Sequence, residues 1–194
     1  MEEYKINGRT VEYDEETHCY IVDGIVVPSV TQILGALFND YEGVSAVVLE
    51  RAREKGTALH EAIERYEKTG EETECRELQN YKFLKRHYGW LNVANEIPII
   101  YEEDGQVLYA GRLDQIIEID GVFGINDFKR VSAPNKDKIA LQLNLYRLGY
   151  EQSYQKKISF LSFTQLREDK RKFTRLPIAE EYTKKLLRSD FLGE

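Results

Sequence analysis

The sequence has few cysteines and no long apolar run, and each shortage excludes a class of protein. Two cysteines, Cys19 and Cys75, cannot supply the four thiolates of a zinc or iron–sulfur site. No apolar segment approaches the roughly 20 residues that a membrane-spanning helix needs. The first residues, MEEYKING, are acidic and lack the apolar centre of a signal peptide. We therefore expect a cytoplasmic protein without a membrane partner.

Repeats and low-complexity linkers are also absent, so composition does not divide the chain. Its 194 residues are enough for one ordinary hydrophobic core and somewhat few for two. Hydrophobic residues make up 42% and charged residues 31%, a balance typical of a globular domain. The sequence therefore predicts a single domain.

The net charge of -7 argues at first against a polyanionic partner. Lysine and arginine are concentrated, however, between residues 129 and 175. That segment has twelve Lys or Arg against four Asp or Glu, which gives +8 there and leaves -15 elsewhere. Such a segment usually forms a solvated basic face. It also suits a surface that binds phosphates, and both interpretations stay open.

Hydrophobic periodicity predicts a mixed α/β arrangement. CYIVDGIVV has the signature of a hairpin around Asp23-Gly24. Ser29 and Gln32 have the spacing of a capping box at the start of a short helix through Leu37. We expect further helices at 45–66 (bent or broken near Gly56), 78–88, 136–154 and 179–187. Strands are expected at 95–101, 107–119, 122–131 and 157–163, followed by a basic hairpin at 167–175. The domain then consists of a hairpin and helix at 1–40, a core at 44–165, and a hairpin and helix at 166–194.

Two carboxylates are predicted to face each other across one hairpin. In the stretch GVFGINDFKRV, alternation places one set of side chains on a common face: Phe123, Ile125, Asp127, Lys129 and Val131. If Asp120-Gly121 form a two-residue turn, Asp114 lies opposite Asp127. Like charges so placed are destabilising, and an apolar surround adds a desolvation cost. A divalent cation such as Mg²⁺, with Lys129 beside it, would resolve the conflict. The alternative is a solvated Asp/Asp/Lys cluster at the end of a sheet.

The next turn, Glu103-Asp104-Gly105, is less decisive. A three-residue loop pairs Glu102 with Gln106 and places Glu96 opposite Arg112, with both on the Asp114 face. A two-residue turn would send Glu96 to the other face.

Two predicted helices contribute polar residues as well. His60 shares a helical face with Gly56 and Glu64, and Gly56 would permit close approach of another element. A lone helical histidine more often packs than binds a ligand. In the later helix, Gln142 and Tyr146 lie on an apolar stripe, where a glutamine needs a polar partner.

Four short motifs occur in a recognisable order: GTALH on a helix, GRLD and DFK on strands, and QLNLY on a helix. This order resembles the PD-(D/E)XK nuclease superfamily, in its RecB-like exonuclease branch. The segment PSVTQIL also resembles one found in phage exonucleases and in mitochondrial genome maintenance exonucleases. The resemblance extends from that segment to Phe163. It implies a restriction-endonuclease-like core, with a central mixed sheet flanked by helices and an N-terminal β-hairpin.

The resemblance also implies a role for particular residues. His60, Asp114, Asp127 and the Phe128 carbonyl would bind Mg²⁺ or Mn²⁺, and Lys129 would position or activate the attacking water. Gln142 and Tyr146 would line the site. Further supporting or DNA-binding candidates are Ser29, Thr31, Arg53, Glu64, Glu96 and Arg112. Some relatives carry an iron–sulfur cluster, but this sequence lacks the cysteines for one.

The implied activity is that of a metal-dependent DNA exonuclease. It would act on single-stranded or end-exposed DNA in recombination, repair or phage DNA metabolism, in a bacterial or phage-infected cell. Basic residues of the later helix and hairpin, with Arg51, Arg53 and Lys55, would follow the phosphate backbone, and tyrosines would stack on bases. One alternative is a structure-specific or restriction-like endonuclease of the same fold. Another is a non-catalytic protein of this fold that binds nucleic acid.

Overall fold

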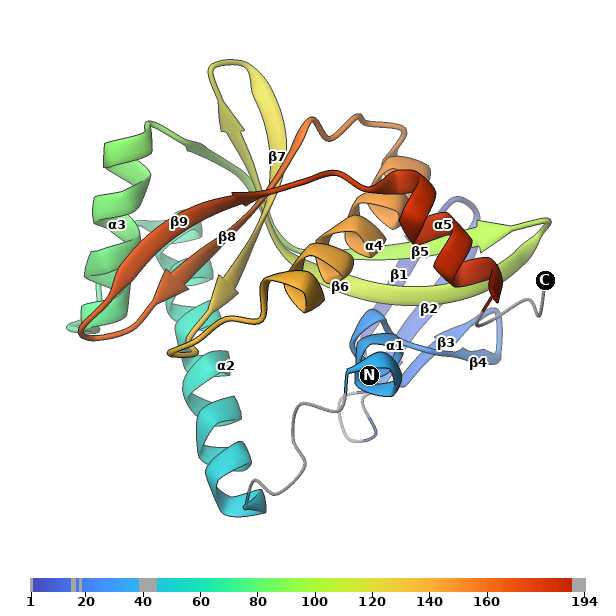
Figure 1. The fold of residues 1–194 in the computed structure, drawn as a ribbon, viewed down its shortest axis with the longest axis horizontal. Helices are drawn as coiled ribbons and strands as arrows, with labels where there is room; N and C mark the ends of the chain where they lie inside the picture. Colours follow the sequence, from blue (N-terminus) through green and yellow to red (C-terminus); the bar gives the residue numbers. More distant parts are fainter. Residues whose placement is uncertain (1, 15–16, 18, 39–44, 190–194) are drawn as a thin grey trace.

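The computed structural model describes residues 2–14, 17, 19–38 and 45–189, apart from the side chains of residues 46, 48, 49 and 53. The described chain forms two β-sheets and five α-helices (Figure 1). The strands are β1 Glu2–Ile6, β2 Arg9–Asp14, β3 Cys19–Val22, β4 Ile25–Val27, β5 Leu91–Glu103, β6 Gln106–Ile119, β7 Val122–Lys129, β8 Phe160–Leu166 and β9 Arg171–Leu176. The helices are α1 Val30–Leu37, α2 Ala46–Thr69, α3 Arg76–Tyr88, α4 Lys136–Tyr154 and α5 Glu180–Leu187.

The N-terminal sheet is antiparallel in the order β1-β2-β3-β4. The predicted hairpin around Asp23-Gly24 is confirmed as β3 and β4. The first two strands were not predicted, so the expected hairpin is in fact half of a four-stranded sheet. Asn7-Gly8 joins β1 to β2, and both residues have positive φ, as in the tight turns that connect antiparallel strands.

The larger sheet is mixed, in the order β5-β6-β7-β8-β9. Only β7 and β8 run parallel, and α4 makes the connection between them. The predicted order of helix, three-strand meander, helix and strand is therefore confirmed. The fourth strand begins at Phe160 instead of residue 157, because Gln155 ends α4 in a left-handed conformation and the next residues cross back to the sheet. β8 is buried along its whole length, which weakens the alternation that marks a strand in sequence.

The predicted break in the second helix is wrong. α2 runs without interruption from Ala46 to Thr69 and ends at Gly70 in a left-handed conformation. The expected close approach of another element at Gly56 is also not found: among the described residues, no atom of another element lies within 4 Å of the position that a Cβ would take. The other helices begin and end close to the predicted positions.

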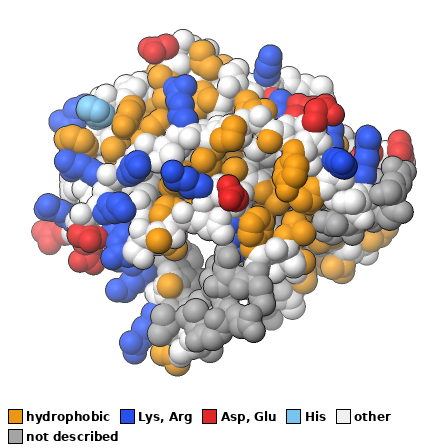
Figure 2. Space-filling model, viewed as in Figure 1, with side chains coloured by type: hydrophobic (Ala, Val, Ile, Leu, Met, Phe, Trp, Pro, Cys, Tyr) orange, Lys and Arg blue, Asp and Glu red, His pale blue; other side chains and the backbone are white. Residues whose placement is uncertain are grey.

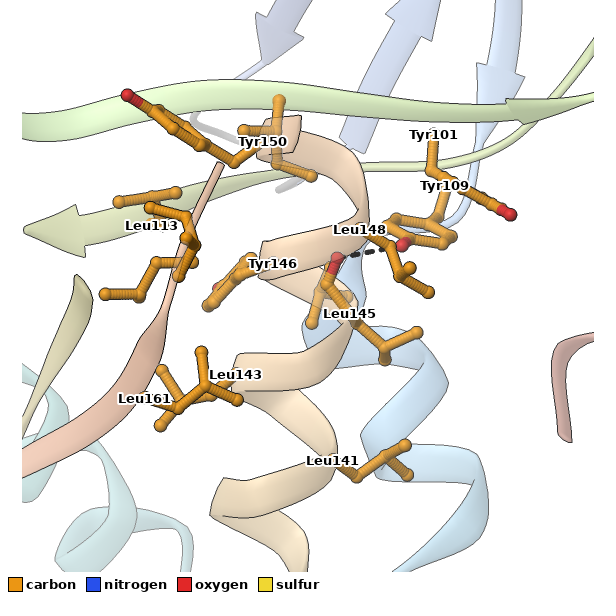
Figure 3. Packing of buried hydrophobic residues seen from close by; sticks show 14 of the residues in the cluster. Tyr101, Tyr109, Leu113, Leu141, Leu143, Leu145, Tyr146, Leu148, Tyr150 and Leu161 are labelled. Carbon is orange, nitrogen blue, oxygen red and sulfur yellow. Dashed lines mark hydrogen bonds between the residues drawn. The ribbon is translucent and has the colours of Figure 1, made fainter. Parts of the chain in front are cut away.

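The helices cover the large sheet on both faces. α4 packs on β5, β6, β7 and β8, and α1 packs beside α4. Figure 3 shows the side chains of α4 interleaved with those of the sheet, with the Tyr109 hydroxyl donating to the Leu145 carbonyl at 2.8 Å. α4 approaches β5 closely because Gly149 has no Cβ, which would lie 2.5 Å from Ile99 Cδ1. A second apolar cluster, including Trp90 and Phe128, lies under α2 and α3. Among the described helices, none combines the length and apolar character needed to span a membrane.

Candidate metal centre

Three carboxylates lie in one row across β5, β6 and β7. The Asp120-Gly121 turn pairs Ile119 with Val122, and the same register continues to Gln115 opposite Asn126. Asp114 and Asp127 are the next residues on the two strands, just beyond the last pair of this register. On the other side of β6, Asn95 pairs with Gln115 and Ile97 with Leu113, so that Glu96 between them lies opposite Asp114. The row is therefore Glu96, Asp114 and Asp127.

The predicted pairing of Glu96 with Arg112 is wrong, although the two side chains do meet. Glu103 pairs with Gln106, so the turn has two residues instead of three, and Arg112 lies opposite Pro98. A register shift next to the turn returns Glu96 to the Asp114 face. Arg112 Nε is then 3.1 Å from Glu96 Oε2, as a diagonal neighbour.

Burial raises the pKa values of the two aspartates. Asp127 is 1% exposed, and only 11% of the Asp114 side chain is accessible. Burial raises the pKa of Asp127 to about 6, against the opposing effect of Lys129. Burial raises the pKa of Asp114 as well, while the charge of His60 opposes the rise. The site thus gathers three carboxylates, with Lys129, Arg112 and His60 as the cations beside them.

Each aspartate is held by a different contact. Asp114 Oδ2 accepts a hydrogen bond of 2.7 Å from the Phe128 backbone N–H. Asp127 Oδ2 lies 2.7 Å from Lys129 Nζ. Asp127 Oδ1 is buried and has no hydrogen-bond donor among the described residues. A buried carboxylate oxygen in this state fits a cation as its partner.

His60 reaches this row from α2. Its Nδ1 is 3.3 Å from Glu96 Oε1, and its Nε2 is 3.7 Å from Asp114 Oδ2. Burial alone would lower the pKa of His60, but the charges of Asp114 and Glu96 raise it to about 9. One ligand atom from each of these three residues lies within 4.8 Å of the others, a spacing that suits a single metal ion. Glu96 therefore joins His60 and Asp114 as a candidate ligand.

Lys129 is fixed by α4. Its ammonium donates to Gln142 Oε1 at 3.1 Å, and this contact supplies the polar partner that Gln142 was predicted to need. Gln142 Nε2 in turn lies 3.5 Å from the Tyr146 hydroxyl. The glutamine thus links the lysine of β7 to the apolar stripe of α4.

A buried chain of polar side chains on the opposite face holds the strands in register. Asn126 donates to Gln115 across β6 and β7, and Thr164 of β8 donates to Asn126. Gln115 also donates to the Tyr81 hydroxyl of α3. Because Asn126 precedes Asp127 and Gln115 follows Asp114, these bonds fix the strand positions from which both aspartates project.

A cavity of about 680 Å³ opens over the row. Nearly all the predicted site residues line it: Ser29, Thr31, His60, Glu96, Arg112, Asp114, Asp127, Phe128, Lys129, Gln142 and Tyr146. Ser29 is held there by the predicted capping box of α1, which the structure confirms. The carbonyl of Phe128 stays a predicted ligand.

Two predicted site residues are not among those that line the main cavity, and two residues that do line it were not predicted. Glu64 lines an adjoining cavity and is paired with Lys68 at 2.6 Å. The side chain of Arg53 lies outside the described part of the structure. Tyr13 and Tyr20, from β2 and β3, line the main cavity but were not predicted by position. The Asn7-Gly8 turn signal could have revealed β2, which carries Tyr13.

The face of β7 that carries Asp127 is less apolar than the sequence suggested. Ile125 is fully buried, but Phe123 is 42% and Val131 48% exposed. The Asp127 side of the strand therefore opens toward solvent at both ends.

The basic residues are spread over several surfaces. On the face of the molecule that Figure 2 shows, Lys and Arg side chains gather on the side where α3 and β9 lie. Lys55 lines a separate cavity of about 340 Å³ under α2. Lys129 and Lys138 line a cavity of about 540 Å³ next to the carboxylates. Of the basic residues expected to follow a phosphate backbone, Lys129 and Lys138 are the described ones that line this cavity.

Comparison with known proteins identifies no family. No family model matches the sequence, and no curated protein matches it. The solved structure titled "Crystal structure of SSO0001" aligns with 61% of this chain and 57% of that chain, at 16% sequence identity and a TM-score of 0.40. The alignment thus spans little more than half of that solved chain.

Proposed function

We propose that the chain is a metal-dependent DNA exonuclease that hydrolyses phosphodiester bonds, with a PD-(D/E)XK core of the RecB-like branch. One observation carries the proposal: the carboxylate row, His60 and Lys129 converge in a single cavity. The order of the motifs GTALH, GRLD, DFK and QLNLY supports the same assignment. Without a bound cation, burial of the two aspartates costs stability that Lys129 and His60 offset only in part, since both aspartate pKa values stay raised.

The donor set fits Mg²⁺ or Mn²⁺. Carboxylate oxygens are the preferred ligands of both ions, and Mn²⁺ also accepts imidazole. His60, Glu96 and Asp114 are spaced to hold one ion, and Asp127 lines the same cavity as the further ligand that the resemblance implies. Once bound, a divalent ion would polarise the phosphoryl group and lower the pKa of a coordinated water.

Lys129 would contribute to the reaction without binding the metal. Asp127 and Gln142 hold its ammonium at the wall of the cavity. From there it can donate to a phosphate oxygen and stabilise the negative charge that develops there in the transition state. Gln142, on α4, keeps the lysine oriented because its Oε1 accepts a hydrogen bond from the Lys129 ammonium.

A nuclease assay with paired variants tests the proposal. Labelled linear DNA is incubated with wild-type protein, Asp114→Asn and Asp120→Asn in Mn²⁺. Asp120 is the matched control because it is an exposed carboxylate in the turn of the same hairpin. We expect Asp114→Asn to lose about 100-fold or more of the activity and Asp120→Asn to keep it. Equal hydrolysis by wild type and Asp114→Asn would contradict the proposal.

The same assay separates the alternatives. Cutting of closed circular DNA at the rate of linear DNA would identify an endonuclease. Retained DNA binding without hydrolysis in any divalent metal would identify a non-catalytic binder.

A further inference from the structure

A second basic surface lies over the face of the large sheet that is opposite to the carboxylate row. On that face, Gln115 of β6 donates to the Tyr81 hydroxyl of α3 at 2.7 Å. α3 also contacts β8 and β9, the last two strands of the sheet. Figure 2 shows this side of the molecule, with Lys and Arg side chains gathered where α3 and β9 lie.

Aromatic rings of α3 stay exposed beside an arginine of β9. Phe83 and Tyr88 are each 41% exposed. The ring of His87, which is also exposed, lies nearly parallel to the Phe83 ring, at a centroid distance of 5.9 Å. The Arg171 guanidinium carbon lies 3.5 Å from the centre of the Phe83 ring. With Arg175, which is exposed on the same strand, these residues form what we call the aromatic–arginine surface: Phe83, His87, Tyr88, Arg171 and Arg175.

The two arginines of this surface have no carboxylate partner among the described residues. Arg171 donates to the side-chain carbonyl of Asn80 at 3.2 Å. Arg175 lies over the ring of Phe160, 4.4 Å from its centre. Because neither partner carries a negative charge, both guanidinium groups keep their full charge for a ligand.

The carboxylates around the aromatic–arginine surface are already paired with other bases. They belong to α3, to the turn between β8 and β9, and to the neighbours of the α3 lysines. The pairs are Glu67 with Lys85, Glu72 with Lys82, Glu77 and Glu168 with Arg130, and Asp169 with Arg167. The surface as a whole therefore favours a negatively charged partner.

The exposed rings narrow the choice of partner further. A solvated basic face needs no exposed phenylalanine, whereas aromatic side chains and arginine planes stack on nucleic-acid bases. A duplex covers the faces of its bases, and an acidic peptide carries carboxylates without planar bases. A single strand of nucleic acid offers phosphates for the guanidinium groups and open base faces for the rings.

We propose that the aromatic–arginine surface binds single-stranded nucleic acid, at a place separate from the candidate metal centre. Phosphates of the strand pair with Arg171 and Arg175, and a base stacks at Phe83. The inference goes beyond the proposed hydrolysis and does not depend on it, since none of these residues lines the cavity over the carboxylates.

Photo-crosslinking locates the bound strand. An oligodeoxythymidine with 5-bromodeoxyuridine at several positions is irradiated with wild-type protein in EDTA, and the cross-linked peptides are identified by mass spectrometry. We expect cross-links on the α3 and β9 peptides that carry Phe83, Tyr88 and Arg171. Cross-links confined to residues that line the carboxylate cavity would overturn the inference, while the proposed hydrolysis would stand.

An affinity measurement tests the stacking. Anisotropy of a fluorescent oligodeoxythymidine is followed in EDTA with wild type, Phe83→Ala and Phe123→Ala. Phe123 is the matched control because it is 42% exposed and lies on the opposite face of the sheet, which carries Asp127. Phe83→Ala should lose about 5-fold or more in affinity, and Phe123→Ala should keep the wild-type value. Equal binding by Phe83→Ala and wild type would overturn the inference.

The salt dependence of the same binding tests the phosphate contact. Arg171→Gln should make the slope of log K against log salt shallower by about 0.7, the value for one lost contact to a single strand. Lys156→Gln is the control, since Lys156 is exposed in the loop between α4 and β8. Thermal unfolding of every variant checks that it is folded. An unchanged slope in Arg171→Gln would contradict a strand path over this surface.

Competition separates a single strand from other polyanions. Unlabelled oligodeoxythymidine should displace the fluorescent strand about tenfold better than a duplex of the same length or polyglutamate of equal charge, because only the single strand can stack. If the duplex or polyglutamate competes equally well, charge alone accounts for the binding and the inference fails.

Discussion

At the scale of single residues, the site consists of groups that the folded protein holds at a cost. Asp127 is a buried carboxylate beside a second buried carboxylate, and its raised pKa records that cost. Glu96 has a φ of 49°, a left-handed conformation that is unfavourable for a non-glycine residue. Asp127 and Glu96 line the same cavity, and Glu96 belongs to the group of converging ligand atoms with His60 and Asp114. Strain and buried charge in one cavity are what the proposed metal site would require, because a bound cation would offset the cost of both.

Asp127→Asn should stabilise the metal-free protein. The substitution removes a desolvated charge, so the free energy of unfolding in EDTA at pH 7.5 should rise by about 1 to 3 kcal/mol. Excess Mn²⁺ should raise the melting temperature of wild type far more than that of the variant. Denaturant unfolding with and without Mn²⁺ measures both effects. A variant less stable than wild type in EDTA would show that the charge stabilises the fold.

Glu96→Asn should separate stability from metal binding. Asparagine tolerates the left-handed conformation better than glutamate, and the partly exposed ion pair with Arg112 contributes only about 0 to 1 kcal/mol. The free energy of unfolding should therefore not fall, whereas Mn²⁺ affinity should fall about 10- to 100-fold. Glu118→Asn, on β6, serves as the control. Unchanged Mn²⁺ affinity in Glu96→Asn would remove Glu96 from the candidate ligands.

At the scale of elements, two-residue turns determine where the site residues lie. Asp23-Gly24, Asp104-Gly105 and Asp120-Gly121 all have positive φ at both positions, so each connects its strands tightly. The Asp120-Gly121 turn could be counted from sequence, and the register that it predicts is confirmed as far as Gln115 opposite Asn126, next to the two aspartates. The register shift after Asp104-Gly105 has no sequence signal of comparable strength. The pairing of Glu96 was therefore mispredicted by two residues.

The start of α3 is joined to the end of β7 by an ion pair that should make stability depend on pH. Burial opposes ionisation of Glu77, but a backbone N–H and Arg130, with Nε 2.9 Å from Glu77 Oε1, lower its pKa below the usual 4.5. A lowered pKa contributes stability that is complete above 4.5 and is lost as the pH falls through the pKa of the folded state.

Glu77→Gln should accordingly be less stable than wild type at pH 7, and the difference should shrink as the pH falls below about 4.5. Chemical denaturation from pH 7 to pH 3 measures it. The exposed Glu181→Gln is the matched control and should show no such convergence. A stability difference that stays constant down to pH 3 would mean that ionisation of Glu77 does not stabilise the folded state.

At the scale of the whole molecule, hydrophobic periodicity and turn counting predicted most of the large sheet, its helices and the β6–β7 register next to the two aspartates. They did not predict that the N-terminal sheet contributes side chains to the cavity. The sequence pattern of a strand does not show which part of the molecule that strand will pack against. Tyr13 and Tyr20 reach the cavity only after β1 to β4 have packed beside β5 and β6. The Glu96 contact with His60 likewise joins elements far apart in sequence.

The net charge also needs the folded structure for its interpretation. From the basic segment of residues 129 to 175, Lys129 and Lys138 are the described Lys or Arg residues that line the cavity beside the carboxylates.

Calorimetric titration of the metal-free protein with Mn²⁺ tests the central claim most directly. The carboxylate row should bind Mn²⁺ with measurable heat at pH 7.5, and the heat should disappear in Asp114→Asn and persist in Asp120→Asn. Mn²⁺ binding of equal strength in wild type and Asp114→Asn, or no binding to wild type, would contradict the account.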